Sequence, residues 1–168
     1  KHTLNGAGNT LTAGSPSDYS LIFNQPGQQI TINDLNIDSK GGGVAAADGA
    51  NVTFNGGNLA VNSASTSGRY LFYAEGEGSV ITINGGEFSF SKTLNQKRAY
   101  IYAGAGTTVY VKGGTFGKAS TRSGYTAGIM GSGTVIITGG IFGFDPTAWV
   151  ADGYQAVENA GVWTVSAI

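Results

Sequence analysis

The stretch Val80-Ile81-Thr82-Ile83-Asn84-Gly85-Gly86-Glu87-Phe88-Ser89-Phe90 decides the fold, because versions of it recur along the chain. Clear copies occupy residues 51–61, 108–116 and 134–144, and residues 30–37 form a weaker copy. The glycine pairs of the four clear copies begin at positions 56, 85, 113 and 139, so one copy follows another after 26 to 29 residues. Self-similarity at such a period is typical of a repeat architecture, in which each copy is one coil.

Apolar and polar residues alternate on both sides of each glycine pair. A two-residue period is that of a half-buried strand and does not line one face of a helix. Each copy is therefore predicted to be a strand, a sharp bend and a second strand, since glycine reaches positive φ without steric cost. A third apolar run follows each copy after a polar loop, at residues 21–23, 44–46, 71–73, 100–102 and 129–130. Three strands per coil predict a roughly triangular parallel β-helix.

Alternation also predicts which side chains point inward and which point outward. The inward residues of the first strands are Ile30, Ile32, Val52, Phe54, Ile81, Ile83, Val109, Val111, Val135 and Ile137. Those of the second strands are Leu35, Ile37, Leu59, Val61, Phe88, Phe90, Phe116, Phe142 and Phe144. The outward row of the first strands is Thr3, Thr31, Thr53, Thr82, Tyr110 and Ile136. This row is interpreted as an exposed strand face, and the alternative is a flat threonine array that orders water, as on ice-binding solenoids.

Composition limits the possible functions. The chain has 168 residues, about one domain, with 29 glycines and only 11% charged residues. A formal charge of -1 and an isoelectric point near 5.7 predict no general affinity for nucleic acid. Without cysteine, and with a single histidine, the sequence offers no thiolate or histidine cluster for a metal, and no cofactor is predicted. No apolar run is long enough to span a membrane, and the start at Lys1 suggests a processed protein or a fragment.

The loops between the second and third strands carry most of the basic residues, seven of the nine in the chain. Variable loops on a rigid scaffold commonly carry recognition. The predicted binding edge consists of Lys40, Arg69, Lys92, Lys97, Arg98, Lys118 and Arg122 with Tyr100 and Tyr102. Asp48, Glu75 and Glu77 fall near the opposite corner. The edge is either a solvated margin, a site for an anionic glycan or phosphate-bearing ligand, or a contact with the acidic corner of a neighbouring subunit.

The C-terminal 24 residues depart from the repeat pattern. Asp145-Pro146 is typical of a helix start, so residues 145–150 are predicted to form one helical turn. Two short strands are expected at 154–157 and 162–165. We therefore divide the chain into a β-helix over residues 1–144 and a capping segment over 145–168. Its aromatic residues, Trp149, Tyr154 and Trp163, are predicted to cover the last coil, with a subunit interface as the alternative.

The repeats and the C-terminal segment resemble right-handed parallel β-helices of the pectate-lyase-like class. The segments 139–146 and 149–154, with Trp163-Thr164-Val165, are similar to modules of phage structural or tail proteins and bacterial surface proteins. The resemblance implies an all-β, right-handed, single-stranded solenoid of about five to six coils with a C-terminal cap. It also implies an extracellular or virion location, and the class includes polysaccharide lyases and hydrolases.

Catalysis by paired carboxylates is not expected from this sequence. Glycan hydrolysis needs two carboxylates about 5 to 9.5 Å apart across a groove. The nearest candidate pairs are Glu75 with Glu77 and Asp34 with Asp38, both in turn regions, where solvated carboxylates are ordinary. A weak calcium site formed by Asp48, Glu75 and Glu77 is a further alternative. We therefore expect no enzyme activity and assign neither a catalytic nor a metal-binding residue.

The sequence favours a non-catalytic structural protein, either a phage decoration, fibre or tailspike component or an extracellular surface protein. Such a protein would display its loops and associate with itself, as a trimer or an end-to-end stack, or with a larger particle. One alternative is a carbohydrate-binding or receptor-binding adhesin acting through Tyr70, Tyr73, Tyr100 and Tyr102. A second alternative is a polysaccharide lyase or hydrolase. Neither nucleic acid nor a membrane span is expected among the partners.

Overall fold

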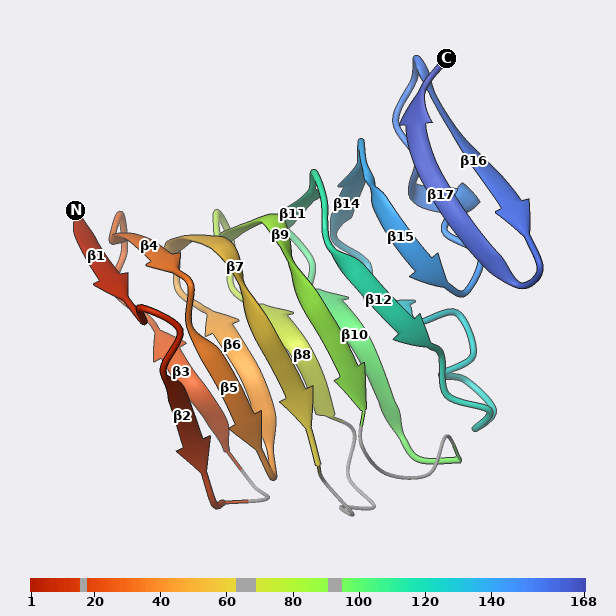
Figure 1. The fold of residues 1–168 in the computed structure, drawn as a ribbon. Coiled ribbons are helices and arrows are strands. Elements are labelled where there is room, and N and C mark those ends of the chain that lie inside the picture. Colours follow the sequence, from red (N-terminus) through yellow and green to blue (C-terminus); the bar gives the residue numbers. More distant parts are fainter. Residues whose placement is uncertain (16–17, 63–68, 91–94) are drawn as a thin grey trace.

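The chain folds into a β-solenoid of about five turns, described by a computed structural model. The structure describes residues 1–15, 18–62, 69–90 and 95–168. The coils stack side by side from β1 at the N-terminal end to a hairpin of β16 and β17 at the other end (Figure 1). The predicted all-β parallel solenoid is confirmed.

Each coil contributes three strands. The first strands are β1 (His2–Asn5), β4 (Gln29–Asn33), the first half of β7 (Asn51–Val61), the first half of β9 (Val80–Phe90), β11 (Thr108–Val111) and β14 (Thr134–Ile137). The second strands are β2 (Thr10–Ala13), β5 (Asn36–Ser39), the second halves of β7 and β9, β12 (Thr115–Lys118) and β15 (Gly140–Gly143). The third strands are β3 (Tyr19–Phe23), β6 (Gly42–Ala46), β8 (Arg69–Ala74), β10 (Arg98–Ala103) and β13 (Ile129–Met130).

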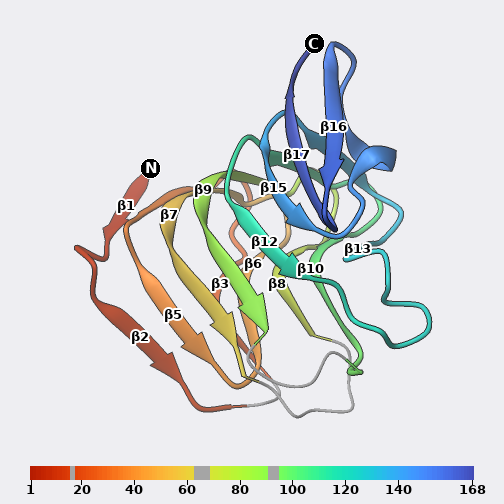
Figure 2. The same ribbon diagram turned by 45° about the vertical axis from the view of Figure 1, so that its right-hand side comes forward.

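Strands at equivalent places in successive coils pair in parallel. The third strands form a five-stranded sheet in the order β13-β10-β8-β6-β3. The first and second strands belong to one twelve-stranded sheet, because β7 and β9 run through the bend between them. Figure 2 shows these two walls facing each other. The predicted outward row is confirmed, since the pairing aligns Thr3, Thr31, Thr53, Thr82, Tyr110 and Ile136.

The glycine pairs make the bend between the two halves of the large sheet. The second glycine has positive φ in all four clear copies, from +106° at Gly114 to +126° at Gly86. A Cβ on Gly57 would lie 2.1 Å from the carbonyl oxygen of Leu35 in the previous coil. The prediction of two separate strands needs one correction. In β7 and β9 the strand continues through the glycines with a shift of register, because the chain bends there without losing its neighbours.

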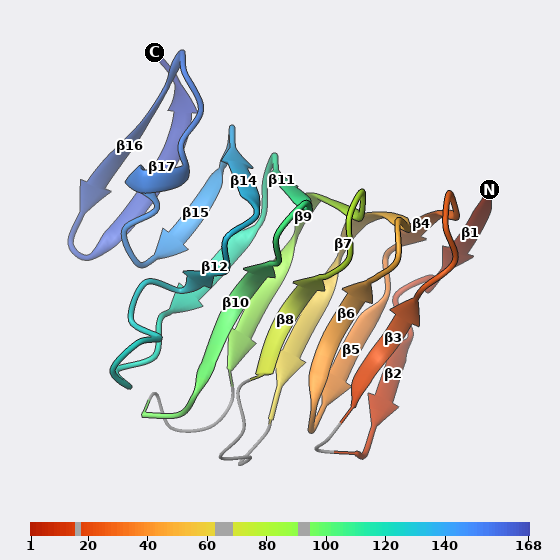
Figure 3. The ribbon, with the colours of Figure 1, turned by 180° about the vertical axis from the view of Figure 1, so that it is seen from behind.

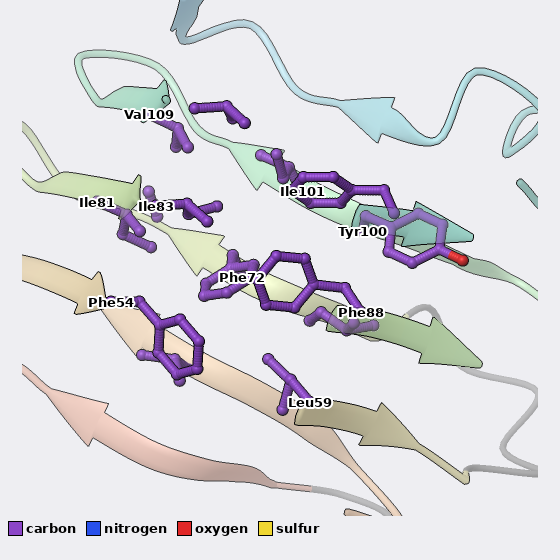
Figure 4. Packing of buried hydrophobic residues seen from close by; sticks show 14 of the residues in the cluster. Phe54, Leu59, Phe72, Ile81, Ile83, Phe88, Tyr100, Ile101 and Val109 are labelled. Atoms are coloured by element: carbon purple, nitrogen blue, oxygen red, sulfur yellow. The ribbon is translucent and has the colours of Figure 1, made fainter. Parts of the chain in front are cut away.

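The side chains predicted to point inward form one core (Figure 4). Phe54, Leu59 and Ile83 have no exposed surface, and only Val135 and Phe90 of the predicted inward set are half-buried. The aromatic residues of the later second strands stack in series. The ring centroids of Phe88 and Phe116 lie 4.7 Å apart, and those of Phe116 and Phe142 lie 4.9 Å apart. Such ring pairs contribute about 0.5–1.5 kcal/mol each beyond the area that they bury.

The C-terminal segment covers the last coil, as predicted. β17 (Val162–Ala167) pairs antiparallel with β15, and β16 (Tyr154–Asn159) pairs with β17. The predicted helical turn is a single 3-10 turn, η1 (Thr147–Trp149), and the backbone N–H and hydroxyl of Thr147 donate to Asp145. These hydrogen bonds lower the pKa of the Asp145 carboxyl. Trp149, Tyr154 and Trp163 are half-buried against the core, the place expected of a cap.

The glycine bend gives a graded stability prediction. Gly57→Ala combines a strained positive φ with overlap against Leu35, and we expect it to lower the free energy of unfolding by about 3–5 kcal/mol. Gly56→Ala has a similar φ but open space around it, so its cost is expected to be smaller. Gly85→Ala has neither problem and serves as the control, with an expected change within about 1 kcal/mol. Urea unfolding followed by circular dichroism measures the series, and equal stability of Gly57→Ala and Gly85→Ala would contradict the argument.

Candidate functional site

The outer face of the five-stranded sheet carries an apolar and aromatic row. Strand pairing aligns Ile22, Ala45, Tyr73, Tyr102 and Met130 across β3, β6, β8, β10 and β13. This face is turned toward the reader in Figure 3. Ile22 is 54% exposed, and both tyrosines and Met130 are half-buried. A continuous row of this kind is unusual on an outer face, where polar residues normally alternate with the buried ones.

Two tyrosines of this row, Tyr73 and Tyr102, pack together with two tyrosines beside it, Tyr19 and Tyr70. We call these four residues the tyrosine face. Tyr73 stacks between Tyr19, at 5.0 Å between ring centroids, and Tyr102, at 5.1 Å. Tyr70 lies 5.8 Å from Tyr73 and 4.9 Å from Tyr102. Tyr19 reaches its partner across Gly42, where a Cβ would lie 2.2 Å from the tyrosine ring. A glycine at that position therefore allows tyrosines from coils that are not adjacent to touch.

The stacking determines what the tyrosine face can offer a partner. The Tyr73 ring stacks with those of Tyr19 and Tyr102, and its hydroxyl proton is donated to Glu75, so the ring edge is what remains for a ligand. Burial raises the pKa of Tyr70 to about 12 and raises those of Tyr19 and Tyr73 further. Neighbouring tyrosines add to each shift because two phenolates would repel each other. The Tyr19, Tyr70 and Tyr73 phenols are therefore neutral at physiological pH.

Opposite charges border the tyrosine face at the two ends of β8. The Tyr73 hydroxyl donates a hydrogen bond to the carboxylate of Glu75, which follows the strand. Arg69, the first residue of the strand, acts electrostatically on Tyr19 and Tyr70 and opposes the rise of both pKa values. A partner lying across this face therefore meets a cation on one side and a carboxylate on the other.

The predicted basic edge is partly present. Lys40, Lys97, Lys118 and Arg122 are exposed on loops or strand ends, and Arg69 is half-buried. Lys97 and Arg122 line one shallow hollow together with Asn95 and Gln96. Lys92 lies outside the described residues. Of the predicted basic edge, Lys97 and Arg122 therefore share a small hollow, and Arg69 lies at the margin of the tyrosine face.

The placement of Arg98 and Tyr100 on that exposed edge is wrong. Arg98 is 2% exposed, Tyr100 is 1% exposed, and both lie in β10. The Arg98 guanidinium lies 5.0 Å from the ring centroid of Phe90, and burial lowers its pKa. The Tyr100 hydroxyl donates to the carbonyl of Lys118, and its ring stacks on Phe144. Strict alternation fails here because four consecutive residues, from Arg98 to Ile101, are all buried.

Sequence reasoning found Tyr70, Tyr73 and Tyr102 but missed Tyr19. Tyr19 precedes the apolar run of its coil and has no tyrosine at the equivalent position of the next coil, where Gly42 pairs with it. The signal that was available is Gly42 itself, the first residue of β6, because a glycine in a strand often marks the close approach of another group.

The acidic candidates do not come together. Among the residues that the structure describes, no group of three or more histidine or acidic side chains is arranged to hold a metal ion. Asp48, Glu75 and Glu77 therefore do not form the calcium site considered as an alternative. Asp34 has a positive φ of 47° in the bend of its coil and lies beside Gly8. The Asp34 carboxylate therefore belongs to a backbone turn of the solenoid.

Comparisons with known proteins give no further assignment. No protein-family model matches the sequence, no curated protein matches it, and no solved structure matches the fold. No helix within the described part of the chain is long and apolar enough to cross a membrane.

The tyrosine pKa values predict a loss of stability at alkaline pH. An unfolded tyrosine ionises near pH 10, whereas Tyr70 in the folded chain ionises near pH 12. The raised pKa of Tyr70 adds to the free energy of unfolding, and this addition is fully present below pH 10. It is lost as the pH rises from about 10 toward 12, because the unfolded chain then loses the tyrosine proton before the folded chain does. Absorbance at 295 nm should show several of the 8 tyrosines ionising late. In Tyr70→Phe the alkaline loss should be smaller, and common ionisation of all tyrosines near pH 10 in the folded protein would contradict the prediction.

Proposed function

We propose that this chain is a non-catalytic assembly protein that associates side by side through the tyrosine face. The observation that carries the proposal is the outward row from Ile22 to Met130, in which Ile22 is exposed and Tyr73, Tyr102 and Met130 are half-buried, with stacked tyrosines along it. Five neighbouring strands give this row a length of about 19 Å. Tyrosine and methionine are enriched at protein interfaces, where a ring supplies apolar area and a hydroxyl supplies a hydrogen bond.

The ring arrangement favours a protein partner over a sugar. Sugar rings bind aromatic platforms by lying on exposed ring faces, and the Tyr73 ring stacks with Tyr19 and Tyr102. The ring edges suit a flat protein surface that packs against them.

The bordering charges make the face complementary to a second copy. Consider a two-fold axis parallel to the solenoid axis, with two tyrosine faces packed against each other. This operation brings the Arg69 margin of one copy against the Glu75 margin of the other. Such an interface is self-complementary in charge, which favours a symmetric dimer. A larger ring, such as the trimer expected from the sequence, would use the same row and is distinguished by its mass.

The resemblance to pectate-lyase-like β-helices supports a location for this assembly protein on a virion or an extracellular surface. Lateral association through one wall leaves the loops between the second and third strands at the margin of the assembly, where they remain available for display. The 11% content of charged residues suits an assembly protein that packs against copies of itself. Turnover of acidic polysaccharides from a substrate panel would overturn the non-catalytic assignment.

The hollow lined by Asn95, Gln96, Lys97 and Arg122 favours a second candidate function, the binding of an anionic glycan. Two cations and two amide groups provide charge attraction and hydrogen bonds for a sulfated or carboxylated sugar. This site lies on the loop edge, so it is compatible with lateral assembly.

The assembly proposal predicts that the chain is an oligomer whose stability depends on the outward row from Ile22 to Met130. The combined substitution of Ile22, Tyr73 and Tyr102 by Ser should weaken association at least about 30-fold, because each aromatic hot spot contributes about 2 kcal/mol. Sedimentation over a concentration series measures the effect. Tyr110→Ser is the matched control, since Tyr110 is a 37% exposed tyrosine on the other sheet. A monomer at all concentrations, or equal loss in the control, would remove the basis of the proposal.

The glycan candidate predicts a charge-dependent loss of binding. Lys97→Glu together with Arg122→Glu should abolish the retention of sulfated or carboxylated oligosaccharides on a glycan array and leave the oligomer intact. Lys112→Glu is the control, because Lys112 is an exposed lysine away from the hollow. Binding that is unchanged in the double variant would assign the ligand to another surface.

A further inference from the structure

The tyrosine face gathers side chains that can lose an electron. The chain has no cysteine and a single methionine, so tyrosine and tryptophan are the side chains most open to one-electron oxidation. Four of the 8 tyrosines contact one another on this face. Tyr110 and Tyr154, in contrast, have no ring partner among the described residues. The tyrosine face is therefore the place where two oxidised phenol rings can meet within one chain.

The Tyr73 phenol is hydrogen-bonded to a base. Its hydroxyl donates to the carboxylate of Glu75, and within the described part of the chain no other tyrosine donates to a carboxylate. Burial and Glu75 raise the pKa of Tyr73, so this phenol holds its proton at physiological pH. A phenol loses an electron at lower cost when its proton passes at the same moment to a base, because the product is then a neutral radical and not a radical cation. Oxidation of the face therefore starts at Tyr73.

The oxidised state can pass from Tyr73 to the neighbouring rings. Between centroids, the Tyr73 ring lies 5.1 Å from that of Tyr102, 5.8 Å from that of Tyr70 and 5.0 Å from that of Tyr19. Rings at these distances are in contact, so an electron moves between them without crossing water. A radical formed at Tyr73 is therefore shared over the tyrosine face.

Tyr70 and Tyr102 are the pair best placed to form a bond. Their ring centroids are 4.9 Å apart and their planes are tilted by 34°. Tyr70 pairs in register with Ala99, three residues before Tyr102, so the two side chains start about 10 Å apart along the strands and lean toward each other. Tyr73 pairs in register with Tyr102 and stacks on it face to face, which keeps the edges of these two rings apart.

We propose that the tyrosine face is a site of oxidative cross-linking, in which Glu75 takes the proton of Tyr73 and a carbon–carbon bond forms between the rings of Tyr70 and Tyr102. The oxidant is hydrogen peroxide acting through a haem peroxidase. The new bond joins the ring carbons next to the two hydroxyl groups and ties β8 to β10, which lie side by side in Figure 3. It supplies a covalent link between strands in a chain that has no cysteine for a disulfide.

The electrons and atoms of this reaction balance. Each of two one-electron steps removes an electron at Tyr73 and moves its hydroxyl proton to Glu75. Tyr73 then regains an electron, from Tyr102 in the first step and from Tyr70 in the second, and its proton returns from Glu75, while the ring that gave the electron releases its own hydroxyl proton to water. The two tyrosyl radicals couple, and the hydrogens on the bonded carbons shift to the oxygens and restore both hydroxyls. The pair has then lost two hydrogen atoms, which reduce one hydrogen peroxide to two water molecules.

Treatment of the full chain with a haem peroxidase and hydrogen peroxide tests the proposal. We expect dityrosine fluorescence at the mass of a single chain on a denaturing gel, and mass spectrometry of a digest should join the peptides that contain Tyr70 and Tyr102. Glu75→Gln keeps a hydrogen-bond acceptor for Tyr73 but is a far weaker base, so it should slow the reaction at least about tenfold. Tyr102→Phe should abolish this cross-link. The midpoint of thermal unfolding of the cross-linked chain should rise, because the bond constrains the unfolded state.

Two controls separate the geometry of the face from the general reactivity of tyrosine. Tyr110→Phe removes a 37% exposed tyrosine on the other sheet and should leave the rate and the cross-linked pair unchanged. The chain unfolded in urea should give mixed cross-links in which Tyr110 and Tyr154 take part, because the ring contacts are then lost. Circular dichroism shows that each variant is folded before the rates are compared.

Three outcomes would overturn the proposal. The first is a folded chain that forms no dityrosine, or one that cross-links Tyr110 or Tyr154 as often as Tyr70 and Tyr102. The second is an equal rate in Glu75→Gln and the unchanged chain. The third is coupling only between separate chains, seen as a doubled mass on the denaturing gel. The cross-link forms within one chain, so a monomer in sedimentation removes the proposed function and leaves this inference standing.

Discussion

The close approach of successive coils at the glycine pairs is the constraint on which this structure depends. Parallel strands in a sheet lie about 4.8 Å apart, and at the bend the backbone of one coil faces the carbonyl of the previous one without an intervening side chain. Gly57 and Leu35 show how little room remains. At Gly57 and Gly86 a Cβ would overlap the backbone of the previous coil, so a larger residue there would weaken the strand pairing beside the bend. The recurring second glycines therefore let successive coils stay in contact through the bend.

A fixed register makes equivalent residues of successive coils lie on top of one another. Inside the solenoid this produces the stack of Phe88, Phe116 and Phe142. Outside, the same rule produces the row of hydrogen-bonded asparagines, Asn5, Asn33, Asn55 and Asn84, and the row from Ile22 to Met130. A single residue type at one position of the repeat thus becomes an extended surface feature. The candidate binding surfaces arise from the repeat in the same way as the core.

The sequence was sufficient for the features that obey the repeat and insufficient for those that break it. Alternation predicted the inward rows, and the change of pattern after residue 144 predicted the hairpin cap. Arg98 and Tyr100 were misplaced because β10 buries four consecutive residues, from Arg98 to Ile101, which a two-residue period does not anticipate. The tyrosine face was found only in part, because Tyr19 reaches Tyr73 across the glycine of the coil between them. A contact that skips a coil leaves no periodic signal.

The hairpin and the tyrosine face bear on association in different ways. Open strand edges bind any compatible strand and are normally protected in proteins. At the C-terminal end of the solenoid the hairpin covers the edge of β15, so strand addition is blocked there. Lateral packing through the tyrosine face uses side chains instead of strand edges, so it can be symmetric and can involve copies of the same chain.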